Sequence, residues 1–178
     1  MQPSVYQRNA ILYGIIGGFI FLLTHIGAWK MGLPAYISVV RIETFIPYVI
    51  GLLILGGLQM RNKNGGFLSY ADALKFAFLA YIIIVLFEGI TNYVLFNIID
   101  KNLTNELLDA SKNQVITMMK KLGATQDKID EAVKNMNEKK DTNFKTILLG
   151  SGTSLIWDFA KAAVIALIIR KEKPVTEN

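Results

Sequence analysis

The sequence lacks cysteine altogether and has one histidine, His25, among its 178 residues. Without thiols the chain can form no disulfide, thiolate metal site, iron–sulfur centre or cysteine nucleophile. Because the sequence has a single histidine, a zinc site built on several histidines is disfavoured as well. No Walker loop, dinucleotide-binding fingerprint, nucleophile elbow or metal-ligand spacing is present either. We therefore expect a protein that is not an enzyme and that uses no metal and no cofactor.

Charged residues are also few, at 19%, whereas hydrophobic residues make up 52% of the chain. This balance, with a mean hydropathy of +0.38, is too apolar for an ordinary soluble domain and indicates an integral membrane protein. The formal net charge of +5 has a simple explanation, because the cytoplasmic flanks of membrane helices are basic. We expect the lipid bilayer to surround the protein, and we expect no nucleic-acid partner.

Four apolar stretches approach the length needed to cross a bilayer, for which a ~30 Å hydrocarbon core requires roughly 20 helical residues. They cover residues 10–29, 45–60, 76–99 and 147–169. The second is short, so either its helix begins before Glu43 or the bilayer thins around it. Residues 30–41, which contain Pro34, are predicted to be a short connection. The fold class that follows is an all-α, integral membrane four-helix bundle.

Residues 100–145 are charged and resemble a soluble segment inserted between the third and fourth spans. Two helical patterns occur there, one over about 104–122 with Gly123 at its end and one that starts after Thr125. Nine Lys against eight Asp and Glu leave this helical hairpin nearly neutral. The predicted organisation has transmembrane helices 1–3 in residues 1–99, the hairpin in 100–145, and the fourth span with a short basic tail in 146–178.

The second hairpin helix carries one apolar stripe, formed by Ile129, Ala132, Val133 and Met136. Such a stripe has to be buried against another surface. Packing on the first hairpin helix is the simplest solution. The membrane surface and a protein partner are the alternatives.

Two spans carry polar and ionisable residues at spacings of three and four, which place them on one helix face. These candidate site residues are Glu88, Thr91 and Asn92 in the third span, and Ser151, Ser154, Asp158 and Lys161 in the fourth. Ionisable groups at this depth are costly unless they face protein or water and find partners. A weaker candidate is His25, which shares a face of the first span with Gly14, Gly18 and Phe21.

Two interpretations of this polar cluster stay open. In the first, Lys161 bridges Asp158 and Glu88 and thereby fixes which helices pack together. In the second, the three ionisable groups carry one net negative charge that a shared proton cancels, so that the cluster serves a proton- or ion-coupled process. A water-filled cavity that reaches these residues would favour the second interpretation.

The distribution of cations predicts the orientation. With four spans, both termini and the second loop share a side, which carries Arg8, Arg61, Lys63, Lys75, Arg170, Lys171 and Lys173. The short loop opposite carries Lys30 and Arg41. Because loops rich in Lys and Arg stay in the cytoplasm, the N- and C-termini are predicted to be cytoplasmic and residues 100–145 extracytoplasmic, in a multi-pass protein of the cell inner membrane.

Several short phrases resemble one known family. They are Ser69-Tyr70-Ala71-Asp72-Ala73-Leu74-Lys75 entering the third helix, Leu122-Gly123-Ala124-Thr125, Met136, and Ile168-Ile169-Arg170-Lys171. Together with the layout, they look like the domain-of-unknown-function family number forty-one ninety-nine, of small inner-membrane proteins in Bacteroidota. The resemblance covers most of the chain and implies a four-span membrane protein. It implies no activity and no catalytic residue.

The function expected from these patterns is that of a small accessory or interaction protein, which meets a protein partner through the 100–145 hairpin. The alternative is a channel or transporter subunit that uses Glu88, Asp158 and Lys161. The chain lacks the clear internal repeat of many transporters. Under this alternative, we therefore expect the chain to form a homo-oligomer.

Overall fold

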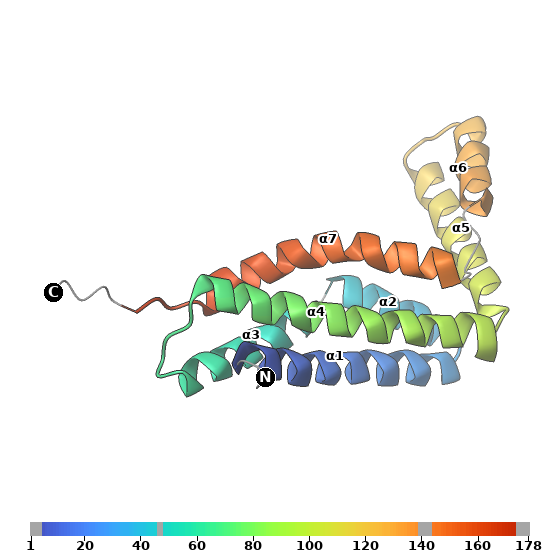
Figure 1. Ribbon diagram of the computed structural model, residues 1–178. Helices are drawn as coiled ribbons and strands as arrows, with labels where there is room; N and C mark the ends of the chain where they lie inside the picture. The colour runs from blue at the N-terminus through green and yellow to red at the C-terminus, as the bar shows by residue number, and fades with distance from the viewer. Residues whose placement is uncertain (1–4, 46–47, 139–143, 174–178) are drawn as a thin grey trace.

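The computed structural model describes residues 5–45, 48–138 and 144–173. The elements are α1 (Val5–Lys30), α2 (Leu33–Phe45), α3 (Tyr48–Lys63), α4 (Tyr70–Tyr93), the π-helix η1 (Val94–Ile99), α5 (Leu103–Lys121), α6 (Gln126–Glu138) and α7 (Phe144–Ile169). In Figure 1, α1, α3, α4 and α7 run side by side, α2 lies next to α1, and α5 and α6 project from one end.

Three helices in this part of the chain are long and apolar enough to cross a membrane. They are Val5–Lys30, Tyr70–Ile99 and Gly152–Ile169. A fourth span results when Leu33–Glu43 and Tyr48–Lys63, bent by 48° relative to each other, are taken together. The predicted class, an all-α bundle of membrane helices, is confirmed.

The prediction that residues 30–41 form only a connection is wrong. The chain turns at Gly32, whose φ of +97° suits glycine, and α2 begins at Leu33. Pro34 is the second residue of α2, where its missing N–H breaks no intrahelical hydrogen bond. When α2 and α3 are taken together as one bent span, this span begins before Glu43, as one of the two alternatives for the short second span had it. As a result, Glu43 lies on a helix that packs beside α1.

Small residues let α4 pack closely between α1 and α7. A Cβ atom added to Gly14 would lie 2.8 Å from Ile83 Cβ, and one added to Gly18 would overlap the Phe87 ring. This is the close approach that the Gly14-x-x-x-Gly18 pattern permits. Toward the end remote from the hairpin, the interface of α4 with α7 belongs to the main core cluster. Its fully buried members are Ala73, Phe76, Ala77, Ala80, Ala162, Ile165, Ala166 and Ile169.

Backbone hydrogen bonds join the start of α4 to the end of α7. Leu68 and Lys171 exchange two N–H···O bonds of 2.8 Å, which form an isolated antiparallel bridge. Arg61 donates to the carbonyl of Ile169, one of the carbonyls left open at the helix end. Ser69 caps α4, since its hydroxyl accepts the Asp72 N–H at 3.1 Å. These contacts fasten the end of the bundle remote from the hairpin (Figure 1).

The hairpin is attached through a second, smaller core around Ala28, Tyr36, Leu95 and Leu103. The Trp29 indole donates to a carboxylate oxygen of Asp100 at 3.0 Å, which ties α1 to the start of α5.

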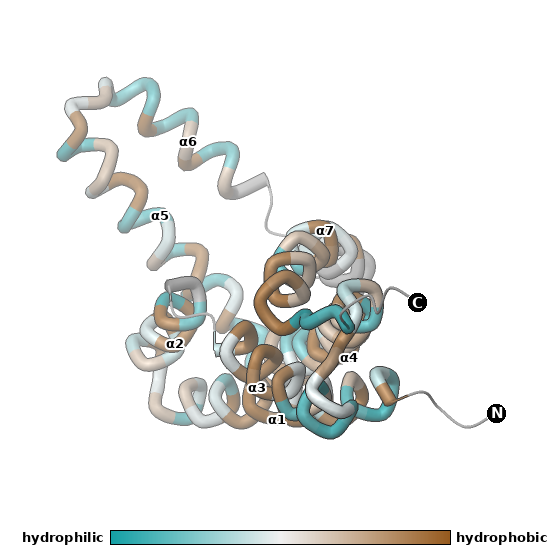
Figure 2. The backbone as a smooth tube through the Cα atoms, turned by 90° about the vertical axis from the view of Figure 1, so that its left-hand side faces the viewer, coloured by the Kyte–Doolittle hydropathy of each residue, from teal (hydrophilic) through white to brown (hydrophobic). Residues whose placement is uncertain are grey.

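The two hairpin helices lie close to the predicted positions. Gly123 ends α5 with a φ of +74°, and Ile129 of the predicted stripe is buried. Because α5 and α6 contact each other, the stripe is at least partly covered within the hairpin. Figure 2 shows hydrophilic and hydrophobic residues alternating along α5 and α6, as in amphipathic helices.

Candidate functional site

Two adjoining open cavities lie in the half of the bundle nearer the hairpin. The outer cavity has a volume of 740 Å³ and the inner one 190 Å³. Phe21, Glu43 and Glu88 line both, so the two cavities meet at these three side chains. We call the pair of cavities with its lining the polar cavity.

The outer cavity extends from the bundle to the base of the hairpin. Arg41 of α2 and Ser111 and Gln114 of α5 line it at that end. His25, Tyr36 and Asn92 are among the side chains that line it within the bundle. The outer cavity therefore connects the polar surface of the hairpin with the level of Glu43 and Glu88.

The inner cavity continues from Glu43 and Glu88 toward α7. Its other polar lining residues are Tyr48, Tyr81, Ser154, Asp158 and Lys161. Five helices thus contribute: α2, α3, α4 and α7, together with α1 through Phe21. Residues far apart in the sequence form one polar surface between spans whose remaining faces are apolar.

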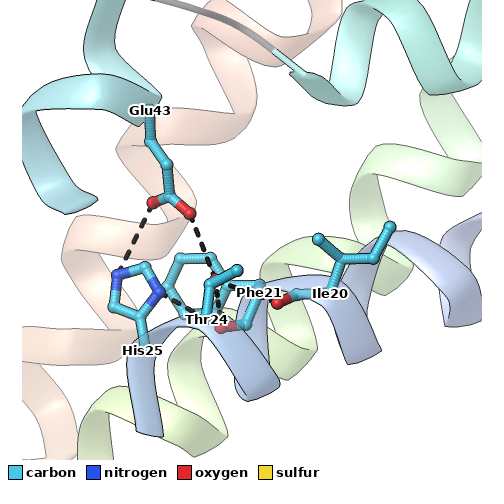
Figure 3. Close-up of polar contacts among 5 residues, drawn as sticks. All are labelled: Ile20, Phe21, Thr24, His25 and Glu43. Atoms are coloured by element: carbon cyan, nitrogen blue, oxygen red, sulfur yellow. Dashed lines mark hydrogen bonds and ion pairs between the residues drawn. The ribbon is translucent and has the colours of Figure 1, made fainter. Parts of the chain in front are cut away.

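Glu43 pairs with His25 across α2 and α1, as Figure 3 shows. The distance from His25 Nε2 to Glu43 Oε2 is 3.5 Å, and His25 is only 3% exposed. Thr24 Oγ1 also lies 3.5 Å from Glu43 Oε1, but its single proton is shared with two backbone carbonyls at 2.9 Å. Neither partner is close, so Glu43 is held loosely.

The second ring nitrogen of His25 fixes where its proton lies. Nδ1 is 3.1 Å from the Phe21 carbonyl, which can only accept, so Nδ1 carries a proton. In the neutral ring, Nε2 is then an acceptor facing a second acceptor, the carboxylate of Glu43. This contact is attractive only when one further proton lies on Nε2 or on the carboxyl group. His25 and Glu43 together therefore form a site for one proton.

Asp158 and Lys161 form an ion pair within α7. Lys161 Nζ is 2.9 Å from Asp158 Oδ1, with the Asp158 side chain 8% exposed and that of Lys161 47% exposed. The same ammonium lies 5.8 Å from the centroid of the Tyr81 ring. No ion pair among the described residues joins Lys161 to Glu88, so the predicted bridge between α4 and α7 has only its Asp158 half. An ion pair inside one helix cannot by itself determine which helices pack together.

The structure brings most of the predicted site residues into the polar cavity. Glu88 lies within electrostatic range of Asp158, Glu43 and Lys161. Asn92 lines the outer cavity and Ser154 the inner one. Thr91 is buried with no hydrogen-bond partner for its hydroxyl and lines neither cavity. The side chain of Ser151 lies outside the described part of the structure.

The sequence patterns missed Glu43 and the tyrosines of the cavity. Glu43 lies between apolar residues of α2 and the span that follows. If residues 33–60 are treated as one span, Glu43 is an ionisable residue within a membrane span and therefore a candidate site residue. Tyr48 and Tyr81 resemble ordinary aromatic packing residues. Both hydroxyls are buried without a hydrogen-bond partner, which only the folded arrangement reveals.

The described residues offer no ready-made metal site, since no group of three His, Asp or Glu side chains among them could hold a metal ion. What the cavity does hold is a carboxylate on each of three helices, one histidine, one ammonium group and, at the hairpin end, the guanidinium group of Arg41. Such a set can store a proton, exchange it between neighbouring groups, and attract a cation.

These features define a helical membrane protein whose spans line an open polar cavity. The particular family is shown by a family model, described as protein of unknown function (DUF4199), that matches residues 9–171. The chain belongs to this family. A search of curated proteins and a search of solved structures each gave no match.

Proposed function

We propose that the protein is a proton-coupled channel or transporter subunit whose working site is the polar cavity. The observation that carries this proposal is the one-proton site of His25 and Glu43, placed where the outer and inner cavities meet. A pair of a buried histidine and a partly buried carboxyl group that needs one proton, with a cavity leading to it, has the composition of a proton relay.

The charges of the cavity support this function. Glu43, Glu88 and Asp158 carry three negative charges when ionised, and Lys161 and Arg41 carry two positive charges, which leaves one negative charge with neutral His25. Uncompensated charge between membrane helices is costly. One proton on the His25–Glu43 pair, or one monovalent cation beside Glu88, removes this excess. The number of bound protons is therefore coupled to the presence of any other cation.

The two ends of the bundle differ in the access that they give to Glu43 and Glu88. Toward the hairpin, the outer cavity gives access to Glu43 and Glu88. Toward the other end, alanine and isoleucine side chains of α4 and α7 are fully buried. Transfer across the whole bundle thus needs a second conformation or a second subunit, and for this reason we propose a subunit of a homo-oligomer or larger assembly.

The test is proton flux into liposomes that contain the purified full-length protein and a pH-sensitive dye. We expect flux under an imposed potential, and we expect Glu43→Gln and Glu88→Gln to abolish most of it. Glu131→Gln, on the exposed surface of α6, is the matched control and should leave flux unchanged. Flux no greater than in empty liposomes, or flux that survives both cavity substitutions, would refute the proposal.

A second candidate function, that of an accessory protein, is supported by the hairpin. It projects from the bundle, and Met118 and Leu122 near its tip are 61% and 75% exposed. Large apolar side chains at an exposed tip suit contact with a protein partner. Replacing both with Ser should lower the mass of the native complex extracted from membranes and leave flux unchanged. An unchanged complex would count against this function.

The proposed location is the inner membrane, with cytoplasmic termini and an extracytoplasmic hairpin. The bias of Lys and Arg toward the side of the termini supports this orientation. Because the chain has no cysteine, single cysteines can report it directly. A membrane-impermeant maleimide should label Lys128→Cys in intact cells and Asn62→Cys only after lysis. The reverse pattern would contradict the orientation.

A further inference from the structure

We propose that the polar cavity binds a primary alkylammonium ion, the protonated form of an amine with a small apolar chain. This inference rests on the proposed function, because it names the cation whose binding is exchanged for a proton. It concerns a ligand site between Glu88, where the outer and inner cavities meet, and Tyr81, which lines the inner cavity.

The first reason is the combination of carboxylates with aromatic rings. Phe21, Tyr36 and Phe96 line the outer cavity, and Tyr48 and Tyr81 line the inner one. Organic cations are recognised by acidic groups together with aromatic faces, over which an ammonium group is attracted within about 6 Å of the ring centroid. The lining therefore offers both the charge and the polarisable surface that an alkylammonium ion requires.

The second reason is that the protein already holds one ammonium group in this manner. Lys161 Nζ lies 2.9 Å from Asp158 Oδ1 and 5.8 Å from the Tyr81 ring centroid. This tethered alkylammonium occupies Asp158 and leaves Glu43 and Glu88 without a lysine or arginine partner among the described ion pairs. A free alkylammonium ion would take the corresponding position beside Glu88.

The third reason is an unused hydrogen-bonding group. Tyr81 is 4% exposed and lines the inner cavity, yet its hydroxyl has no hydrogen-bond partner. A buried polar group without a partner is costly and calls for an explanation. A primary ammonium has three N–H donors, so it can serve the Glu88 carboxylate and the Tyr81 hydroxyl oxygen together. A quaternary ammonium has no such donor.

The size and chemistry of the cavity favour an organic cation over a metal ion. Small-molecule pockets typically span about 300–1,000 Å³, and the outer cavity measures 740 Å³. A bare divalent ion such as Ca²⁺ requires six or more converging oxygen ligands, whereas no metal-binding group is found among the described residues. Apolar side chains, among them Ile37 and Val40, are available to contact an alkyl chain.

The test measures binding separately from transport. Purified full-length protein in detergent is titrated calorimetrically with butylammonium chloride, tetramethylammonium chloride and sodium chloride. We expect butylammonium to bind with release of protons, shown by heats that depend on the ionisation enthalpy of the buffer. Tetramethylammonium should bind more weakly, and sodium should give no saturable heat.

Two variants and one control locate the site. Glu88→Gln should weaken butylammonium binding at least about tenfold, as expected for the loss of a charge-assisted hydrogen bond. Tyr81→Phe keeps the ring and removes only the hydroxyl, so the ratio of the affinities for butylammonium and tetramethylammonium should become smaller. This variant also provides a test if Glu88→Gln does not fold. Glu131→Gln should bind as the wild type does.

The outcomes separate this inference from the proposed function. Saturable butylammonium binding that depends on Glu88, in a protein without proton flux, would support the site and refute the proton-coupled function. Proton flux without saturable butylammonium binding, or with binding indifferent to Glu88 and Tyr81, would overturn the ammonium site and leave the proposed function standing.

Discussion

Replacing Gly14 with Ala tests how closely α1 and α4 are packed. The added Cβ would lie 2.8 Å from Ile83 Cβ and 3.1 Å from the backbone oxygen of Ala80. Carbon atoms attract best at about 3.5–4.0 Å, so the helices would have to separate by close to an ångström. A gap of that size forfeits up to about half of each affected contact.

The expected magnitude is the balance of two effects. Overpacking of this kind costs about 1–3 kcal/mol. Alanine is better than glycine inside a helix by about 0.5–1 kcal/mol. Gly14→Ala should therefore destabilise the fold by about 0.5–2 kcal/mol. Gly27 provides a matched control in the same helix, because a Cβ there would meet nothing within 4 Å, and Gly27→Ala should stabilise slightly.

The assay is reversible unfolding by SDS in mixed micelles, followed through the fluorescence of Trp29 and Trp157. Gly14→Ala should unfold at a lower SDS fraction than the wild type, and Gly27→Ala at the same or a higher fraction. Equal midpoints for the two variants would show that the contact with Ile83 is not a constraint. The close α1–α4 packing would then be refuted as the role of Gly14.

Three further substitutions test local contacts of the fold. Ser69→Ala removes the cap of α4 and should cost about 1 kcal/mol in the same SDS assay; an unchanged midpoint would count against the cap. Gly123→Ala places a Cβ at a φ of +74° and should destabilise the hairpin by about 1–2 kcal/mol, which limited proteolysis would detect as faster cleavage within α5 and α6. Trp29→Phe removes the 3.0 Å hydrogen bond to Asp100 and should cost about 1 kcal/mol; hydrogen exchange should then quicken at the start of α5, and unaltered protection there would contradict the anchoring role.

Features that depend on a few neighbouring residues could be predicted from the sequence. The cap at Ser69 and the stop at Gly123 follow from hydrogen-bonding groups and backbone freedom at single positions. The long apolar spans follow from length and composition. In the same way, the three- and four-residue spacing placed Asp158 and Lys161 together on one face, where the structure has their ion pair.

The polar cavity could not be predicted from the sequence, because it depends on contacts between distant residues. Pro34 and Arg41 suggested a connection, because a proline stops a helix except near its start and a cation suits a loop. Only packing against α1 makes α2 a helix that presents Glu43 to His25. The location of Tyr81 could not be predicted either, since tyrosine packs equally well in an apolar core and in the wall of a polar cavity. What distinguishes the two is a neighbour more than 70 residues away, Asp158.

The bridge between Leu68 and Lys171 has a mechanical consequence. Two rods joined at one end separate most at the other, and this bridge joins α4 and α7 at the end remote from the polar cavity. Asp158 stands 11 residues before Ile169, which is about 16 Å along α7. A swing of about 5° around the bridge would move Asp158 by about 1.4 Å and the start of α7 by more than twice as much. If α4 and α7 separate, the backbone bridge would therefore serve as the hinge, and the displacement would be largest at the hairpin end of the bundle.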